Sequence, residues 1–369
     1  MLTPMDDSHW HQTSSTFDHV ATSDPRFFDR VWFAASSRDG TATIHVTLGV
    51  YQNMNVVDAG CIVIVDGVQH NVRVSRELRP EFTTVCGPLG IEVVEPLHRA
   101  RITIEPGEHG IAGELTWTSV VPPHEEPQHF RRVRGRVVED YARFDQIGVC
   151  DGWIEVAGTR VEVADWWSCR DHSWGVRERV GIPEPVTGTD APRAGGLFAF
   201  LFYSTDTHAG HAQVARGGME YSSAGTTDRK NGVVVDGIPV TGISAVFSDE
   251  ERPRRMTHVS LTLDTPGGPT RVDLEADRPA VAMTGLGYGG YRDGLGLGAY
   301  RGPSHIEYDR WDVGHPAVVG LPDGSTVRPN HRIQPVRVTQ HNPDGSTAHG
   351  QGSLTFVAEG DLKALGITE

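Results

Sequence analysis

The hydrophobic and polar positions of this chain alternate over short segments, a pattern that is typical of half-buried β-strands. Apolar side chains stand at every second position of residues 43–48 and of residues 258–263. Asp-Gly and Asn-Gly dipeptides, which favour tight hairpin turns, recur from residue 39 to residue 344. A pattern that favours a short helix occurs only at residues 361–365. The sequence therefore predicts an all-β chain.

The turn signals divide the chain into two halves of similar strand content. A stretch rich in Pro, Gly and Thr at residues 181–196 is typical of a linker or a long loop. Because 369 residues exceed the usual size of one compact core, we expect two consecutive antiparallel β-barrel or sandwich domains, residues 1–180 and residues 181–369. Strands are expected in the first half near 42–50, 60–74, 91–104, 112–120, 131–139 and 152–164, and in the second half near 197–204, 211–217, 238–247, 256–264, 270–275, 304–312, 325–328, 332–340 and 351–358.

Composition narrows the classes of partner. The formal charge of -15, from 33 basic and 48 acidic residues, repels a phosphate backbone, so no nucleic-acid partner is expected. The four cysteines are far apart in the sequence, which favours reduced, buried thiols over a zinc knuckle or a disulfide framework. No apolar leader and no run of 18 apolar residues occurs, so we expect no transmembrane segment and a cytoplasmic location. Whether identical chains assemble into a homo-oligomer is left open.

Chemistry-bearing residues are densest at residues 165–177, which contain three Trp, two Asp, one His and two Arg. In an extended strand, Arg170, His172 and Trp174 share one face and Asp171 takes the other, because side chains alternate. His172 can carry a proton near neutral pH, and the Trp174 indole can stabilise a nearby cation. Asp171 can orient the imidazole or exchange protons itself. The alternative is a structural clasp in which Arg170 or Arg177 pairs with Asp171 or Asp165.

The motif Arg-Asp-His-Ser-Trp-Gly-Val-Arg at 170–177, followed by the Phe-rich segment 197–202, resembles the signature of the carotenoid 1,2-hydratase superfamily. That group includes hydroxyneurosporene synthases, kievitone-hydratase-like proteins and AttH-like proteins with two lipocalin-like domains. The resemblance implies that a His-x-Trp pair and a downstream Tyr-x-Asp pair add water to an isoprenoid double bond. His172 and Trp174 match the first pair. Tyr203 and Asp206 stand one residue too far apart for the second, which makes Asp171 the better candidate acid.

These residues and the resemblance together predict a cofactor-independent hydratase, dehydratase or related isomerase for a lipophilic molecule of the terpenoid, carotenoid or steroid kind. Asp171 or His172 would protonate an alkene or a tertiary hydroxyl, and aromatic rings would stabilise the carbocation. Residues 285–298 are expected to form a glycine-rich flap. A non-catalytic lipophile carrier and a pericyclase-like protein are the alternatives. The substrate pocket is expected near the domain junction, lined by Trp166, Trp167, Trp174, Phe198, Phe200, Phe202 and Tyr288.

Three further segments have ordinary explanations that we favour. No metal site is expected, and His208 and His211 are interpreted as surface histidines because they stand three apart and lack further ligands. Residues 304–312 place His305, Glu307, Asp309 and Trp311 on one strand face, either lining a polar pocket or facing outward, and we favour the outward face. Residues 141–146 are expected to form an amphipathic strand whose aromatic side chains seal the domain interface.

Overall fold

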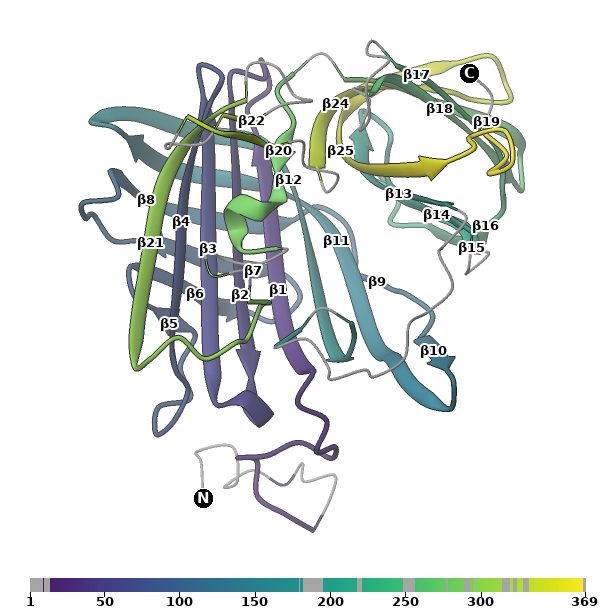
Figure 1. Cartoon of the computed structure of the whole chain (residues 1–369). Helices are drawn as coiled ribbons and strands as arrows, with labels where there is room; N and C mark the ends of the chain where they lie inside the picture. Colours follow the sequence, from purple (N-terminus) through teal and green to yellow (C-terminus); the bar gives the residue numbers. More distant parts are fainter. Residues whose placement is uncertain are drawn as a thin grey trace.

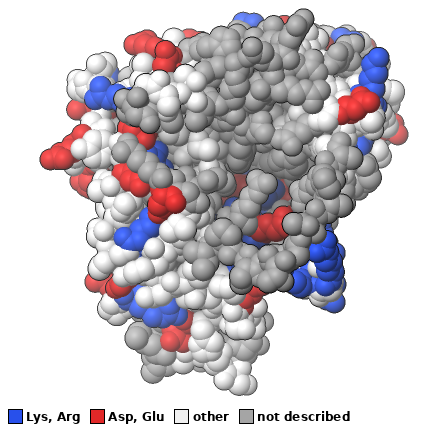
Figure 2. Space-filling view, viewed as in Figure 1, with Lys and Arg blue, Asp and Glu red and all other residues white. Residues whose placement is uncertain are grey.

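A computed structural model of the chain describes residues 9, 14–178, 180–181, 195–217, 221–247, 256–276, 278–288, 293, 295–313, 319–320, 324–327 and 332–367. The all-β prediction is confirmed: these residues form two curled antiparallel sheets that lie side by side (Figure 1). Acidic and basic side chains are interspersed over the described part of the face in Figure 2. No helix in the described part of the chain is long and apolar enough to cross a membrane.

The first sheet contains 15 strands within the described residues, in the order β23-β22-β21-β4-β3-β2-β1-β12-β11-β8-β7-β6-β5, with β9 and β10 also paired to β11. The bounds are β1 (Phe27–Ser36), β2 (Ala42–Tyr51), β3 (Val56–Val65), β4 (Val68–Glu77), β5 (Val85–Cys86), β6 (Leu89–Glu95), β7 (Arg99–Ile104), β8 (Ile111–Ser119), β9 (His124–Glu125), β10 (His129–Val133), β11 (Arg136–Val156), β12 (Thr159–Val176), β21 (Ser304–Asp312), β22 (Val319–Gly320) and β23 (Thr326–Val327). The 3-10 turn η2 (Gln52–Met54) joins β2 to β3.

The second sheet contains 10 strands of the described chain, in the order β16-β15-β14-β13-β25-β24-β19-β18-β17, with β20 paired to β24. The bounds are β13 (Gly195–Thr205), β14 (His208–Arg216), β15 (Tyr221–Asp228), β16 (Val234–Ile238), β17 (Val240–Phe247), β18 (Met256–Thr265), β19 (Gly268–Glu275), β20 (Val281–Ala282), β24 (Arg332–His341) and β25 (Thr347–Gly360). A second 3-10 turn, η3 (Met283–Leu286), follows β20.

Local turn chemistry explains the two hairpins that shape the first sheet. Asp66 and Gly67 have positive φ angles of 52° and 76°, as a tight primed turn between β3 and β4 requires. Ala157 and Gly158, with φ of 50° and 82°, turn β11 into β12 in the same way. β11 and β12 are the longest strands described, and their long hairpin runs beside the second sheet (Figure 1).

The strand pairing crosses the predicted division of the chain. β21, from the half expected to form the second domain, pairs with β4 of the first sheet from Ser304 opposite Arg76 to Asp312 opposite Val68. The boundary at residues 180 and 181 stays a prediction, and most of the predicted linker 181–196 lies outside the described residues. The helix expected at 361–365 is instead a set of hydrogen-bonded turns, with the Leu365 amide 3.2 Å from the Asp361 carbonyl oxygen.

Apolar side chains of the described residues form one core inside each sheet, a small cluster around Phe28 and Tyr51, and a further core between the sheets. We call the core between the sheets the seam. Fully burying a large apolar side chain contributes about 1.5–3 kcal/mol, so the seam is a substantial share of what holds the two sheets together. Its larger members are Trp32, Ile62, Ile64, Ile147, Trp167, Phe200, Phe202, Met283, Leu286 and Trp311.

Candidate functional site

β12 presents the residues of the 165–177 motif on its two faces. Arg170 pairs across the strands with Phe33 of the first core, so Arg170, His172 and Trp174 face the interior of the first sheet. Asp171 pairs with Trp32, a seam residue, and therefore lies on the seam face. His172 and Trp174 share one face of β12 and Asp171 lies on the other, as the alternation of the sequence predicts.

His172 belongs to a partly exposed aromatic cluster. Its Nε2 atom lies 2.7 Å from Oδ1 of Asp29, and its ring centroid lies 5.4 Å from those of both Phe144 and Trp174. Trp174 is 39% exposed. On the same face, the Arg170 guanidinium stacks over Trp117 at 4.5 Å, and burial lowers the Arg170 pKa to about 10.

The two carboxylates of the motif pair with arginines outside the motif, one in the turn between β1 and β2 and one on β11. Asp165 pairs with Arg38, and Oδ2 of Asp171 lies 3.4 Å from Nε of Arg143. Asp165 and Asp171 therefore pair with Arg38 and Arg143, and not with Arg170 or Arg177 as the clasp alternative predicts.

Tyr203 and Asp206 lie away from His172 and Trp174. Tyr203 is 1% exposed and packs inside the second sheet, where burial raises its pKa to about 12. Asp206 is exposed in the bend after β13, and its amide donates to the His349 carbonyl oxygen at 3.1 Å. The structure does not bring the four residues nominated by the resemblance to one place.

Most of the predicted pocket aromatics do meet at the seam. Phe200 and Phe202 have ring centroids 4.5 Å apart, and Phe202 lies 6.1 Å from Trp32. Phe198 packs against the same cluster, which also contains Trp167, whereas Trp166 faces the first core.

Tyr288 is fixed at the edge of the seam by a buried polar network. Its hydroxyl accepts a hydrogen bond from Nε of Arg30 at 3.3 Å, and Nη1 of Arg30 donates to Asp58 at 2.6 Å. Asp58 also accepts from the Gly298 amide at 2.7 Å. These contacts anchor both ends of the glycine-rich segment expected to be a flap, of which residues 289–292 and 294 lie outside the described residues.

Three ionisable residues that the sequence did not single out lie around Asp171 at the seam. Arg143 places Nη1 3.5 Å from Glu126 and its guanidinium 5.4 Å from the Phe200 ring centre. The third, Asp145, pairs across the strands with Asp171. The aromatic side chains of residues 141–146 were expected to seal the interface, but Phe144 packs against His172 on the other face of the sheet. The sequence held no sign that Glu126, just beyond β9, lies beside Arg143.

The environments of these carboxyl groups drive their pKa values apart. Burial, together with the nearby Glu126 charge, raises the pKa of Asp145 well above its ordinary value. Burial also raises the pKa of Asp171. Burial opposes ionisation of Glu126 too, but the Arg143 charge and the hydrogen bond with His129 outweigh it and lower the Glu126 pKa. Within this one cluster the pKa values of Asp145 and Asp171 are therefore raised, whereas that of Glu126 is lowered.

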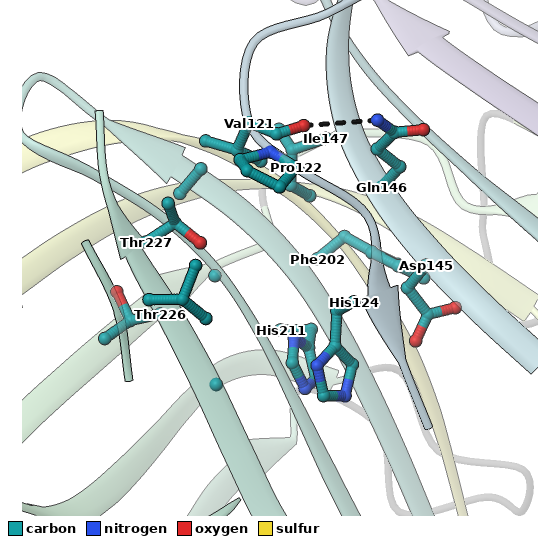
Figure 3. Close-up of a pocket in the computed structure, with 14 residues that line it drawn as sticks. Val121, Pro122, His124, Asp145, Gln146, Ile147, Phe202, His211, Thr226 and Thr227 are labelled. Atoms are coloured by element: carbon teal, nitrogen blue, oxygen red, sulfur yellow. Dashed lines mark hydrogen bonds between the residues drawn. The ribbon is translucent and has the colours of Figure 1, made fainter. Parts of the chain in front are cut away.

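A cavity of about 30 Å³ opens between β11 of the first sheet and β14 and β15 of the second (Figure 3). Asp145, Phe202, His124, His211 and Thr226 are among its lining residues. Since a water molecule needs about 10–15 Å³ measured this way, the cavity has room for about two. His172 and Trp174 do not line it.

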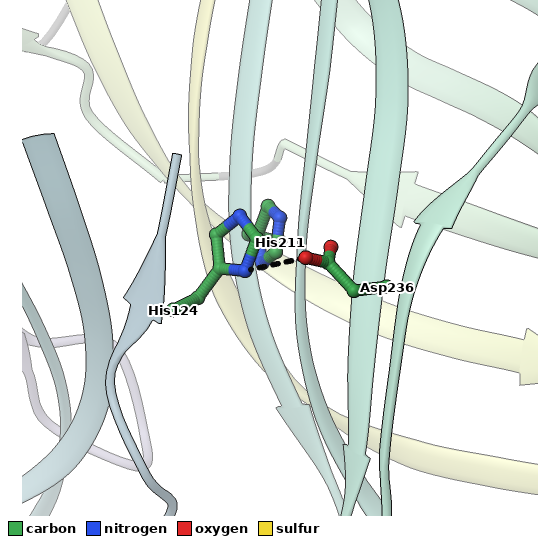
Figure 4. A group of neighbouring side chains, drawn as sticks. All are labelled: His124, His211 and Asp236. Carbon is green, nitrogen blue, oxygen red and sulfur yellow. Dashed lines mark ion pairs between the residues drawn. The ribbon is translucent and has the colours of Figure 1, made fainter. Parts of the chain in front are cut away.

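His124, His211 and Asp236 meet at one end of this cavity (Figure 4). The two imidazole rings stack with centroids 3.7 Å apart, and Nδ1 of His124 lies 3.3 Å from Oδ2 of Asp236. The surface interpretation of His211 is wrong, because β9 covers it and burial lowers its pKa to about 3. His208 stays at the start of β14, beside Thr207. Among the described residues, these three side chains are of types that bind metal ions, and their ligand atoms lie close enough together to hold one ion.

The polar face of β21 turns inward, against the favoured interpretation of the sequence. Asp309 is 5% exposed and accepts a hydrogen bond from Arg73 at 2.7 Å. Arg73 is itself 2% exposed and lies over Trp311. His305 and Glu307 on the same face are partly buried. The face is inward because β21 lies against β4 and buries Trp311 in the seam.

Comparisons with known proteins agree with this architecture. A model described as "Family of unknown function (DUF8625)" matches residues 2–318. None of the curated proteins matches the sequence. Among solved structures, kievitone hydratase from Nectria haematococca is similar with a TM-score of 0.52 and 11% identity, over 89% of each chain. CghA is similar with a TM-score of 0.51 and 12% identity, over 91% of this chain and 89% of the other. The fold implied by the family resemblance, two lipocalin-like domains, is confirmed.

Proposed function

We propose that this chain, which belongs to the DUF8625 family, is an enzyme of hydration or dehydration. The function of that family is unknown. The enzyme would add water to a small lipophilic molecule at the seam, or remove water from it. The fold shared with kievitone hydratase and CghA is consistent with an enzyme of the hydratase or pericyclase kind. The observation that carries the proposal is the position of Asp171, a partly buried carboxyl group on the seam face of β12, beside Arg143, whose guanidinium lies over the Phe200 ring.

In the hydration direction, the protonated Asp171 carboxyl donates its proton to an alkene carbon. A water molecule then forms the new carbon–oxygen bond at the cationic carbon, and the proton that this water loses returns to the Asp171 carboxylate. In the reverse direction, Asp171 protonates a tertiary hydroxyl, water leaves, and the carboxylate removes a proton from the neighbouring carbon. The aromatic faces of Phe200, Phe202 and Trp167 stabilise the developing cation.

The cavity beside Asp145 is large enough for water, the second reactant, but too small for a lipophilic substrate. It holds about two water molecules, so a lipophilic molecule enters only when side chains of the seam move apart. His172 and Trp174 are assigned no proton transfer at the seam, because they lie on the other face of β12.

The test uses a panel of isoprenoid alkenes and tertiary alcohols, with incorporation of oxygen from labelled water as the readout. Asp171→Asn should lower turnover by about 10²- to 10⁴-fold, the usual contribution of a general acid, while the protein keeps its fold. Asp165→Asn is the matched control, since Asp165 lies on the same strand and is exposed.

Three results would count against the proposal. Equal turnover by Asp171→Asn and the wild type would remove Asp171 from the chemistry. Loss of turnover in His172→Ala alone would move the reaction to the interior face of the first sheet. Absence of turnover, with an unchanged lipid recovered by native mass spectrometry, would indicate the alternative, a non-catalytic lipophile-binding protein.

A further inference from the structure

We propose that His124, His211 and Asp236 bind one divalent transition-metal ion of the zinc type, and that this ion ties the two sheets together. The three ligands come from both sheets. His124 belongs to β9, which pairs with β11 of the first sheet, whereas His211 and Asp236 belong to β14 and β16 of the second. The inference concerns a different set of side chains from Asp171 and does not rest on the proposed reaction.

The ligand atoms are already close to the spacing that a metal ion requires. One ligand atom from each residue lies within 4.8 Å of the other two. Nδ1 of His124 and Oδ2 of Asp236 are 3.3 Å apart, which is about the separation of two ligand atoms around a tetrahedral zinc with bonds of about 2.0 Å. The two rings are stacked with their planes 25° apart, and the Asp236 carboxylate lies beside them (Figure 4). Because a bound ion lies in the plane of each imidazole, one ring must turn out of the stack to complete the set.

Gly225 is a second, independent sign that this place is built to hold these side chains. It lies on β15 directly opposite His211. A Cβ atom at this position would lie 2.3 Å from Cε1 of His211 and 2.9 Å from Oδ1 of Asp236. Any other residue at 225 would push both ligands away, so the glycine keeps open the space in which they meet.

The donor set and the adjacent cavity fit a zinc-type ion. Two imidazole nitrogens and one carboxylate oxygen suit zinc and similar transition metals, whereas magnesium and calcium prefer oxygen ligands alone. The cavity of about 30 Å³ begins at His124 and His211 and supplies room for a water molecule in the fourth coordination position. Asp236 is 47% exposed, so an ion can reach the site from solvent.

The experiment titrates the chelator-treated full-length protein with Zn²⁺ in a calorimeter and with Co²⁺ in a spectrophotometer. We expect one ion per chain, intense visible Co²⁺ bands of a four-coordinate site, and a rise in melting temperature on Zn²⁺ addition. His124→Gln should weaken binding by about 100-fold or more, because it removes a direct ligand. His124 belongs to none of the apolar cores, so this substitution leaves them intact.

Gly225→Ala is the sharper variant, because it keeps every histidine and carboxylate of the chain while displacing two ligands. It should weaken Zn²⁺ binding to a similar degree. His208→Gln, on the same strand as His211 but outside the group, is the matched control and should bind as the wild type does. Binding of unchanged strength and stoichiometry in His124→Gln, or no binding by the wild type, would overturn the proposal.

Discussion

Replacing Arg143 with methionine tests whether the buried charges at the seam depend on one another. The Arg143 side chain is 9% exposed and the Glu126 side chain 2% exposed, with 3.5 Å between them. Methionine keeps much of the apolar stem but removes the charge, and it leaves the Glu126 carboxylate with His129 at 2.5 Å as its remaining basic neighbour. A buried charge that loses its partner destabilises a protein by about 3–5 kcal/mol.

The expected loss of unfolding free energy can be converted into a change in melting temperature. An unfolding entropy of about 2.1 cal/mol/K per residue, applied to 369 residues that unfold together, converts a loss of about 3–5 kcal/mol into a fall of about 4–6 °C in melting temperature. Glu126→Gln alone should also destabilise the protein, because Arg143 then retains only Asp171 among its close carboxylates. The double variant should lose about 1–3 kcal/mol less than the sum of the two single variants.

Guanidinium unfolding followed by tryptophan fluorescence and circular dichroism measures all four proteins of this cycle. The wild type and the three variants are compared at one pH and one salt concentration. If the losses of the single variants add to within about 0.5 kcal/mol in the double variant, the two charges are not coupled, and our account of the seam network is refuted.

Three further predictions concern the same region. The pKa of Asp171 is raised on folding, so its contribution to stability is present below its unfolded pKa of about 3.9 and is lost as the pH rises. Asp171→Asn should therefore gain stability relative to the wild type as the pH is raised from 4 to 7, measured by thermal melting. The ionisable groups around Asp171 are Arg143, Arg177, Glu126 and Asp145, with His172 next to it in the chain on the other face. Phe202→Ala removes a ring that is 2% exposed and should cost about 3–5 kcal/mol while enlarging the cavity, so that a small apolar probe such as benzene raises the melting temperature of the variant only. Trp174→Ala should cost less than about 1.5 kcal/mol in denaturant unfolding, because the indole is 39% exposed and contributes mainly ring contacts with His172 and Phe144.

The sequence predicted those parts of the structure that depend on neighbouring residues. Alternation predicted many of the strands, although not β1 or β15. The Asp66–Gly67 turn predicted a hairpin, and the period of two placed His172 and Trp174 on one face of β12. Each of these follows from the geometry of a few consecutive residues.

The parts that the sequence missed depend on which distant strands pair. Glu126 meets Arg143 because β9 folds onto β11, and His211 meets His124 because the two sheets close on one another. Hydrophobic period identifies a strand and its two faces, but it does not state which strand lies opposite or which face is covered. The same limit explains why the polar face of β21 was expected to point outward.

The passage of β21 back to the first sheet has a consequence for any attempt to study the halves as separate fragments. A fragment ending near residue 180 would leave the β4 edge, Val68–Glu77, without its neighbouring strand, and an uncovered edge recruits other chains into aggregates. The complementary fragment would carry residues 304–312 with no partner edge to join. Each piece expressed alone should be poorly soluble, and the two expressed together should reassemble by complementation.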